Sequence, residues 1–263
     1  MKSNTLSTST LAAGETRPGS GAMFDRIAGR YDLLNRIMTF GLDHGWRRRT
    51  VKALALREGS RVLDLATGTA DMALEVLRQQ PTATVVGIDP SENMLAVGRE
   101  KVAASQLERS IELRTGVAEA LPFEDNSFDG LCIAYGIRNV PDRRGALGEM
   151  ARVVRPGGRV VILEATEARG GPLAWGARFW VHHVVPRLGA LLSNAPEYRY
   201  LQKSIAAFPA PAEFAGWMEQ AGLRMIERKG MTFGANTLFV AEPMSKDSSA
   251  KNSSSKASKG DRQ

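Results

Sequence analysis

The chain has 263 residues, of which 43% are hydrophobic, and this length suits one large domain rather than two independent ones. Its single cysteine, Cys132, excludes a disulfide framework, and its apolar neighbours indicate a buried structural thiol rather than a nucleophile. The formal net charge is +7, no apolar run reaches the length of a membrane span, and the N-terminus lacks the core of a signal peptide, so we expect a cytoplasmic protein.

The two ends of the chain have the composition of disordered segments. Residues 1–20 are rich in Ser, Thr and Gly, and residues 243–263 form a Ser/Lys tail whose five Lys and Arg and two Asp residues supply +3 of the net charge. Between them we predict a single domain over residues 21–242. Apolar residues recur at helical spacing between 22 and 56, which predicts an N-terminal lid of two helices, broken near Gly41, with Asp43 as the N-cap of the second.

Short apolar runs alternate with helical patterns after the lid, which predicts an α/β fold. The strands are expected at 61–66, 85–89, 111–114, 128–134 and 159–164. Helices are expected at 71–78 and 143–154, and a further helix should begin after Ser91, which is its N-cap. A helix at 211–221 and strands at 223–228 and 237–241, paired antiparallel at one edge, complete the sheet. Residues 170–208 read as an aromatic-rich helical insertion after the fifth strand, where ligands bind to open parallel sheets.

The turn after the first strand has the pattern of a nucleotide-binding loop. Gly68 lets the backbone approach a ligand closely, and N–H groups at the start of the next helix can bind a carboxylate or phosphate. Asp89 closes the second strand, where an acid accepts hydrogen bonds from adenosine ribose hydroxyls. These features do not separate S-adenosylmethionine (SAM) from NAD, although Ala66 and Ala70 replace glycines of the dinucleotide fingerprint. A tight turn beside a surface acid is the structural alternative.

Later segments make the pattern more specific. The loop 116–129 leads into the fourth strand with Ala118 and Glu119 expected beside an adenine, and a Pro-Gly-Gly turn at 156–158 precedes the fifth strand. In this order, the turn, the acid and the two later segments resemble class I SAM-dependent methyltransferases. That resemblance implies a Rossmann-like, seven-stranded sheet.

Four further segments are similar to the UbiE/MenG family over about residues 23–241; they are 24–35, 135–140, 183–189 and 198–201. The resemblance implies SAM-dependent C-methylation of polyprenylated quinol rings, most directly demethylmenaquinol to menaquinol, with the benzoquinol step of ubiquinone synthesis as a second acceptor. It places SAM contacts on the following residues: Asp64, Gly68, Thr69, Asp89, Val117, Ala118 and Ala134. Val117 stands where many relatives have Asn, and Ala134 stands where some have Ser, so only contacts through backbone atoms would survive at these two positions.

Ring methylation needs an electron-rich carbon, support for phenolate charge and a proton acceptor. The candidate catalytic residues are Arg138, Asn139, Tyr31 and His183, and the acceptor is expected to contact Tyr31, Asn35, Arg138, Tyr198 and Tyr200. A structural salt bridge for Arg138 and packing roles for the aromatic residues are the alternatives. No metal-ligand cluster stands out, and the chemistry needs no metal.

The substrate's polyprenyl tail suggests reversible, peripheral contact with the inner membrane face. Aromatic and basic residues of the insertion suit such a surface, although they would equally seal the pocket; they are Trp175, Phe179, Trp180, Arg178, Arg187 and Arg199. Three rival functions remain: methylation of another phenolic or sterol acceptor, nucleic-acid binding through the basic charge, and NAD-dependent oxidoreduction. Without aromatic-rich or zinc-finger motifs, nucleic acid is not the partner that we expect. The prenyl length and the oligomeric state are open, a homodimer being one option.

Overall fold

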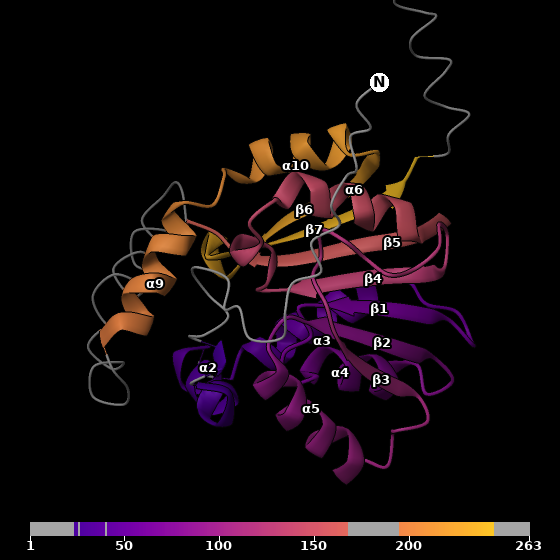
Figure 1. The fold of residues 1–263 in the computed structure, drawn as a ribbon. Coiled ribbons are helices and arrows are strands. Elements are labelled where there is room, and N and C mark those ends of the chain that lie inside the picture. Colours follow the sequence, from indigo (N-terminus) through magenta and orange to yellow (C-terminus); the bar gives the residue numbers. More distant parts are fainter. Residues whose placement is uncertain (1–23, 26, 40, 168–194, 245–263) are drawn as a thin grey trace, which may run out of the picture.

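The computed structural model describes residues 24–25, 27–39, 41–167 and 195–244. Both predicted disordered ends, except residues 243 and 244, and most of the predicted insertion lie outside the described residues. The strands are β1 (Arg61–Leu65), β2 (Thr84–Asp89), β3 (Ile111–Thr115), β4 (Phe128–Ala134), β5 (Val154–Ala165), β6 (Leu223–Met231) and β7 (Asn236–Pro243). They form one sheet in the order β3-β2-β1-β4-β5-β7-β6 (Figure 1).

Strands β1 to β5 run parallel to one another, whereas β7 runs antiparallel to both β5 and β6. The expected seven-stranded α/β sheet and its antiparallel pair at one edge are therefore confirmed. The helices are α2 (Tyr31–Thr39), α3 (Asp43–Ala53), α4 (Asp71–Gln79), α5 (Glu92–Ala104), α6 (Arg143–Val153), α9 (Ala195–Ala206) and α10 (Pro211–Gln220), with short 3-10 turns η1 (Ala28–Arg30), η2 (Ile137–Asn139) and η4 (Thr232–Gly234).

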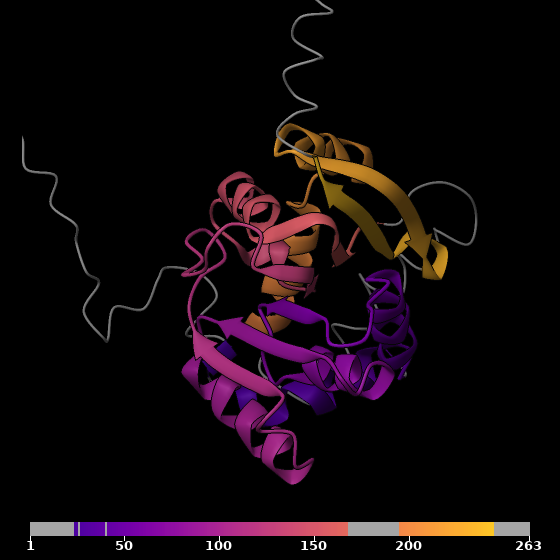
Figure 2. The same cartoon turned by 90° about the vertical axis from the view of Figure 1, so that its right-hand side faces the viewer.

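Helices cover both faces of the twisted sheet (Figure 2). Because successive side chains of a strand point to opposite faces, each central strand feeds two cores. Leu63 and Leu131 join the core beneath α6 and α10, whereas Val62 and Cys132 join the core beneath α3, α4 and α5. Burial on both faces explains why these strands appear in the sequence as continuous apolar runs.

Several predicted boundaries move by one to three residues, and β6 extends to Met231; the N-cap of α3 and the start of β5 differ more substantially. Asp43 is the first residue of α3 and not its N-cap, which is Leu42, and the Asp43 side chain caps no backbone group; Ser91 is confirmed as the N-cap of α5, accepting the Met94 N–H at 3.2 Å. β5 begins at Val154, before the predicted Pro-Gly-Gly turn at 156–158. The pairing with β4 shifts register between Phe128 and Gly130, so the Pro-Gly-Gly segment forms an irregularity inside β5 instead of a turn before it.

Two segments distant in sequence lie beyond the same end of the sheet, α2 from the N-terminal part and α9 from the predicted insertion (Figure 1). Side-chain contacts join α2 to the turn after β1 and α9 to the turn after β4, so both lie at the carboxyl ends of the parallel strands. Helicity is confirmed for this part of the insertion. No helix among the described residues has the length and apolar character needed to span a membrane.

The thiol of Cys132 is fully buried in the middle of β4. Burial raises its pKa well above the ordinary value, and the nearby carboxylate of Asp64 raises it further. Since only the thiolate is an efficient nucleophile, we expect a thiol reagent to modify the native protein at least about a hundredfold more slowly than free cysteine. Denaturant should expose the thiol and restore the rate. Rapid modification of the native protein would contradict a structural role for Cys132.

Candidate active site

The turn between β1 and α4 keeps a backbone conformation that normally favours glycine. Ala66, Gly68 and Ala70 have φ angles of 51°, 56° and 65°. For a residue with a Cβ atom this left-handed region costs about 1 kcal/mol. The two alanines therefore adopt the glycine-like geometry of a nucleotide-binding turn, although the sequence lacks the glycines of the dinucleotide fingerprint.

Asp89, at the end of β2, fastens this turn from the neighbouring strand. Its Oδ2 accepts the N–H of Gly68 at 2.9 Å, and its Oδ1 accepts the N–H of Ser91 at 2.9 Å. Burial raises the pKa of this carboxyl group from 3.8 to about 6, the two backbone donors lower it, and the nearby Asp25 raises it again. The structure thus joins the predicted turn and the predicted acid in one contact.

The other predicted cofactor residues surround this contact. Gly116 donates its N–H to the carbonyl oxygen of Asp89 at 3.1 Å, which brings the half-buried pair Val117–Ala118 to the same place. Ala134 is the last residue of β4, the strand beside β1. Asp64 lies deeper: its buried carboxyl accepts from the hydroxyl of Thr67 at 2.5 Å, and burial raises its pKa to about 7.

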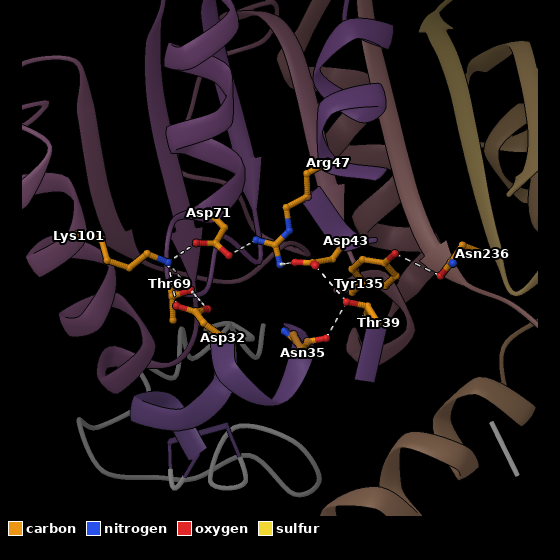
Figure 3. Close-up of polar contacts among 10 residues, drawn as sticks. All are labelled: Asp32, Asn35, Thr39, Asp43, Arg47, Thr69, Asp71, Lys101, Tyr135 and Asn236. Atoms are coloured by element: carbon orange, nitrogen blue, oxygen red, sulfur yellow. Dashed lines mark hydrogen bonds and ion pairs between the residues drawn. The ribbon is translucent and has the colours of Figure 1, made fainter. Parts of the chain in front are cut away.

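The N-terminal lid directly contacts the turn between β1 and α4, residues 66–70, which is called the cofactor turn below. The hydroxyl of Thr69 donates to Asp32 of α2 at 2.7 Å, and Lys101 of α5 donates to Asp32 at 2.9 Å and to Thr69 at 3.2 Å (Figure 3). The N-terminal segment makes a second contact close to Asp89, where the hydroxyl of Ser91 donates to Asp25 at 2.5 Å. The N-terminal segment therefore touches both loops between which the adenosyl group is expected.

An ion-pair network extends from this contact into α3. Lys101 and Arg47 both bind Asp71, the first residue of α4, and Arg47 also pairs with Asp43 at 3.6 Å (Figure 3). Burial on its own would raise the pKa of Asp71, but Arg47 and Lys101 hold that pKa below the ordinary value. The lid helices are thus joined to the cofactor turn by charges as well as by packing.

A second polar cluster lies after β4, on η2. The side chain of Arg138 is buried and pairs with Glu164 of β5 at 2.6 Å, and Asn139 accepts the hydroxyl of Tyr200 from α9 at 3.1 Å. Gly136 makes this position possible, since a Cβ atom there would clash with the Cβ of Ala66 in the cofactor turn. The predicted cofactor site and part of the predicted acceptor site therefore adjoin.

The remaining predicted acceptor residues are only partly described. Tyr31, at the start of α2, lies within electrostatic range of Arg138 and packs edge-on against Phe24 at a centroid distance of 6.0 Å. Asn35, one turn later, accepts the hydroxyl of Thr39 at its backbone carbonyl at 2.8 Å. Tyr198 belongs to α9, but its side chain lies outside the described part. His183 also lies outside the described residues.

Several polar residues of the site were not predicted from the sequence; they are Asp25, Arg47, Asp71, Lys101 and Glu164. Most are charged residues in helices, which the sequence pattern assigns to a solvated surface. Glu164 offered a signal, because it follows the apolar run 160–163 at the end of a buried strand. An acid in that position lies at the carboxyl edge of the sheet, next to the residue that follows the neighbouring strand.

The comparisons with known proteins agree with this geometry. The model of the ubiE/COQ5 methyltransferase family matches residues 11–242. A ubiquinone/menaquinone biosynthesis C-methyltransferase UbiE from Geobacter sulfurreducens is 46% identical over 84% of this chain and 86% of its own. A demethylmenaquinone methyltransferase from Thermus thermophilus is 44% identical over 84% of this chain and 99% of its own.

The solved structure of a SAM-dependent methyltransferase from Aquifex aeolicus matches the fold with a TM-score of 0.59 at 19% identity, covering 82% of this chain and 97% of that one. At this identity the likeness concerns the fold alone. The family model and the two relatives confirm the family that the four sequence segments indicated. The chain belongs to the ubiE/COQ5 methyltransferase family.

Proposed function

We propose that this chain transfers a methyl group from SAM to a ring carbon of a polyprenylated quinol, with demethylmenaquinol as its acceptor. Its relatives carry names for this chemistry in menaquinone and ubiquinone biosynthesis, and the benzoquinol of the second route is the alternative acceptor. One structural observation carries the proposal: the packing of Gly136 against Ala66 brings the buried Arg138 beside the cofactor turn.

The donor end of the site is formed by the β1 turn, Asp89 and the loop at Val117–Ala118. Each oxygen of Asp89 accepts one backbone N–H and keeps a lone pair, which suits a carboxylate that binds two ribose hydroxyls. Thr69, in the turn before α4, is suited to the methionine carboxylate through its backbone N–H, and Gly68, whose N–H already donates to Asp89, lets the backbone approach the cofactor closely. Val117, Ala118 and Ala134 contact the cofactor through backbone atoms, so the departures of Val117 and Ala134 from the family pattern are tolerated. Asp64 stabilises the turn by accepting the hydroxyl of Thr67. The proposed reaction uses no metal ion.

The affinity for SAM should depend on the protonation of Asp89. With its pKa at about 6, the Asp89 carboxyl group is almost fully ionised above about pH 7. Below the pKa, the affinity for SAM should fall roughly tenfold per pH unit. Because the charge of Asp25 raises this pKa, Asp25→Asn should move the fall in affinity to lower pH, while its amide oxygen can still accept from Ser91. Titration calorimetry across this range measures the midpoint. Exposed Glu227→Gln is the control, and an unchanged midpoint in Asp25→Asn would refute the coupling.

The acceptor end uses the cluster on η2. When bound, SAM supplies a methyl group that the ring carbon takes as the carbon–sulfur bond breaks, after which the ring loses a proton. Charge on the phenol oxygen makes that carbon more nucleophilic, so a hydrogen-bond donor aimed at the oxygen lowers the barrier. Arg138 is suited to this role, because its buried Nε has no hydrogen-bond partner among the described residues. Its high pKa makes it a donor to the oxygen or to a water rather than a base.

The neighbouring side chains complete the acceptor site. Asn139 and Tyr200, hydrogen-bonded to each other, form one wall, and Tyr31 with Asn35 on the lid forms another. Tyr198 and the candidate base His183 belong to this proposal as expectations from the sequence, as both lie in or beside the part that is not described.

The prenyl tail of the acceptor leads to a proposal about location. We expect a cytoplasmic protein that binds reversibly to the inner membrane face through the aromatic and basic residues of 170–208. Sedimentation with anionic liposomes measures this binding, and neutral liposomes test the contribution of charge. A protein that stays in the supernatant with both kinds of liposome would disprove the membrane contact but not the methyl transfer.

The decisive experiment incubates the purified protein with SAM and chemically reduced demethylmenaquinol and analyses the quinones by mass spectrometry. The expected product carries one additional ring methyl group. The reduced benzoquinol precursor and a simple phenol serve as comparison acceptors. Methylation of the simple phenol at an equal rate would overturn the acceptor assignment, and the absence of SAM-dependent product with every acceptor would overturn the proposed function.

A further inference from the structure

The cluster on η2 contains an acid to which the proposed reaction gives no part. Glu164 lies near the end of β5, and its side chain is 0% exposed, against 8% for its partner Arg138. Its Oε1 accepts Nη1 of Arg138 at 2.6 Å and the N–H of Ala165 at 2.8 Å, and its Oε2 accepts the backbone N–H of Arg138 at 3.1 Å. One carboxylate therefore fixes both the backbone and the guanidinium of Arg138.

Tyr135 supplies a second anchor for the same guanidinium. Its carbonyl oxygen accepts Nη1 of Arg138 at 2.6 Å, and its φ of 59° is a left-handed value that a tyrosine adopts only when its surroundings impose it. The ring is also held in place: its hydroxyl donates to Asn236 at 3.2 Å (Figure 3), and it lies tilted against Trp46 at a centroid distance of 6.3 Å. The contacts of the ring therefore help to fix the backbone whose carbonyl oxygen binds Arg138.

These anchors do not use every donor of the guanidinium. Nη1 is used by Glu164 and by Tyr135, whereas the buried Nε has no hydrogen-bond partner among the described residues. A buried donor without a partner is costly, so native proteins seldom keep one without a ligand or water for it. This Nε also lies at the carboxyl ends of β4 and β5, where an open parallel sheet binds its ligands.

We infer that Glu164 is a positioning residue for methyl transfer, which holds Arg138 so that Nε faces the phenol oxygen of the acceptor. This inference rests on the role of Arg138 in the proposed function. A purely structural pair is a poor explanation, because burying two charges seldom stabilises a protein more than apolar side chains of the same volume. Glu164 also neutralises the guanidinium, which suits a site that admits a neutral quinol and develops negative charge only during the reaction.

Glu164→Gln tests the inference, because it keeps the shape of the side chain but removes one acceptor and the charge. We expect kcat with demethylmenaquinol to fall about 10- to 100-fold, the usual range when the partner that orients a reactive group is lost. The dissociation constant for SAM should stay within about twofold, since the carboxylate of Asp89 is untouched. Glu75→Gln is the matched control, as Glu75 accepts two hydrogen bonds from Arg78 within α4 and touches no residue of the site.

A double-mutant cycle separates positioning from stability. If Glu164 acts through Arg138, the double variant Arg138→Met with Glu164→Leu should be no slower than Arg138→Met alone. The double variant also leaves no unpaired buried charge, so it still tests the inference if Glu164→Gln fails to fold. Three results would overturn the inference: wild-type kcat in folded Glu164→Gln, a loss equal to that in Glu75→Gln, or wild-type kcat in the apolar pair. An inactive wild-type protein would instead refute the proposed function.

Discussion

Replacing Asp89 with alanine should weaken SAM binding by at least about a hundredfold. A hydrogen bond to a charged group contributes about 1.5–3 kcal/mol, and the variant loses two such bonds to the ribose. It also leaves the N–H groups of Gly68 and Ser91 without their acceptor, so the turn that meets the cofactor loses its anchor to β2. A loss of about 3 kcal/mol is already more than a hundredfold in affinity. Titration calorimetry at about pH 8, where the native carboxylate is ionised, measures the effect.

The control for this variant is an exposed acid whose carboxylate also accepts a backbone N–H. Asp142 caps α6 by accepting the N–H of Gly145 at 2.9 Å and is not one of the residues of the proposed donor site. Asp142→Ala should lower the free energy of unfolding by about 1 kcal/mol and leave SAM affinity unchanged. Asp89→Ala that binds SAM as the wild type does would remove the basis for the donor site, and with it the proposed reaction.

The sequence was informative wherever the signal is local. The β1 turn and Asp89 were predictable because a nucleotide site needs a tight turn after one strand and an acid closing the next, and parallel strands bring those two ends together. The two sheet faces were equally predictable, since strands buried on both faces become continuous apolar runs. The left-handed backbone of Ala66 and Ala70 was not predictable, because propensity disfavours it and the close packing that accommodates it, of Ala66 against Gly136 and of Ala70 against Gly98, involves residues distant in sequence.

The polar contacts between distant segments could not be derived in the same way. Arg138 and Glu164 are 26 residues apart, and their pairing depends on the register between β4 and β5, in which Ala134 aligns with Leu163. The contact between Asp32 and Thr69 depends on where the lid docks, which no periodicity in the lid specifies. In both cases the sequence supplied the residue types near the site, but only the folded chain shows which of them face one another.

Removing the guanidinium of Arg138 should slow methyl transfer far more than it weakens binding. Loss of one donor to a developing oxyanion commonly costs 10²- to 10³-fold in rate, about 3–4 kcal/mol, and we expect kcat in Arg138→Met to fall by that amount. SAM affinity should change by less than about twofold, because the hydrogen bonds of Asp89 lie on β2 and not on η2. Single-turnover measurements with demethylmenaquinol separate the chemical step from product release.

The sharper variant is Arg138→Lys, which keeps the positive charge. If charge alone supports the phenol oxygen, lysine should restore most of the rate lost in Arg138→Met. If the unpaired Nε is the donor, lysine should fail, because its single ammonium is drawn to Glu164 and to the Tyr135 carbonyl and leaves nothing at the Nε position. Arg144→Met is the control, since Arg144 is exposed on α6, where it stacks on Trp217 at 4.4 Å and donates to Gln220 at 2.6 Å. Full activity in Arg138→Lys would show that the geometry of the guanidinium is dispensable and that the buried pair serves only to place a positive charge.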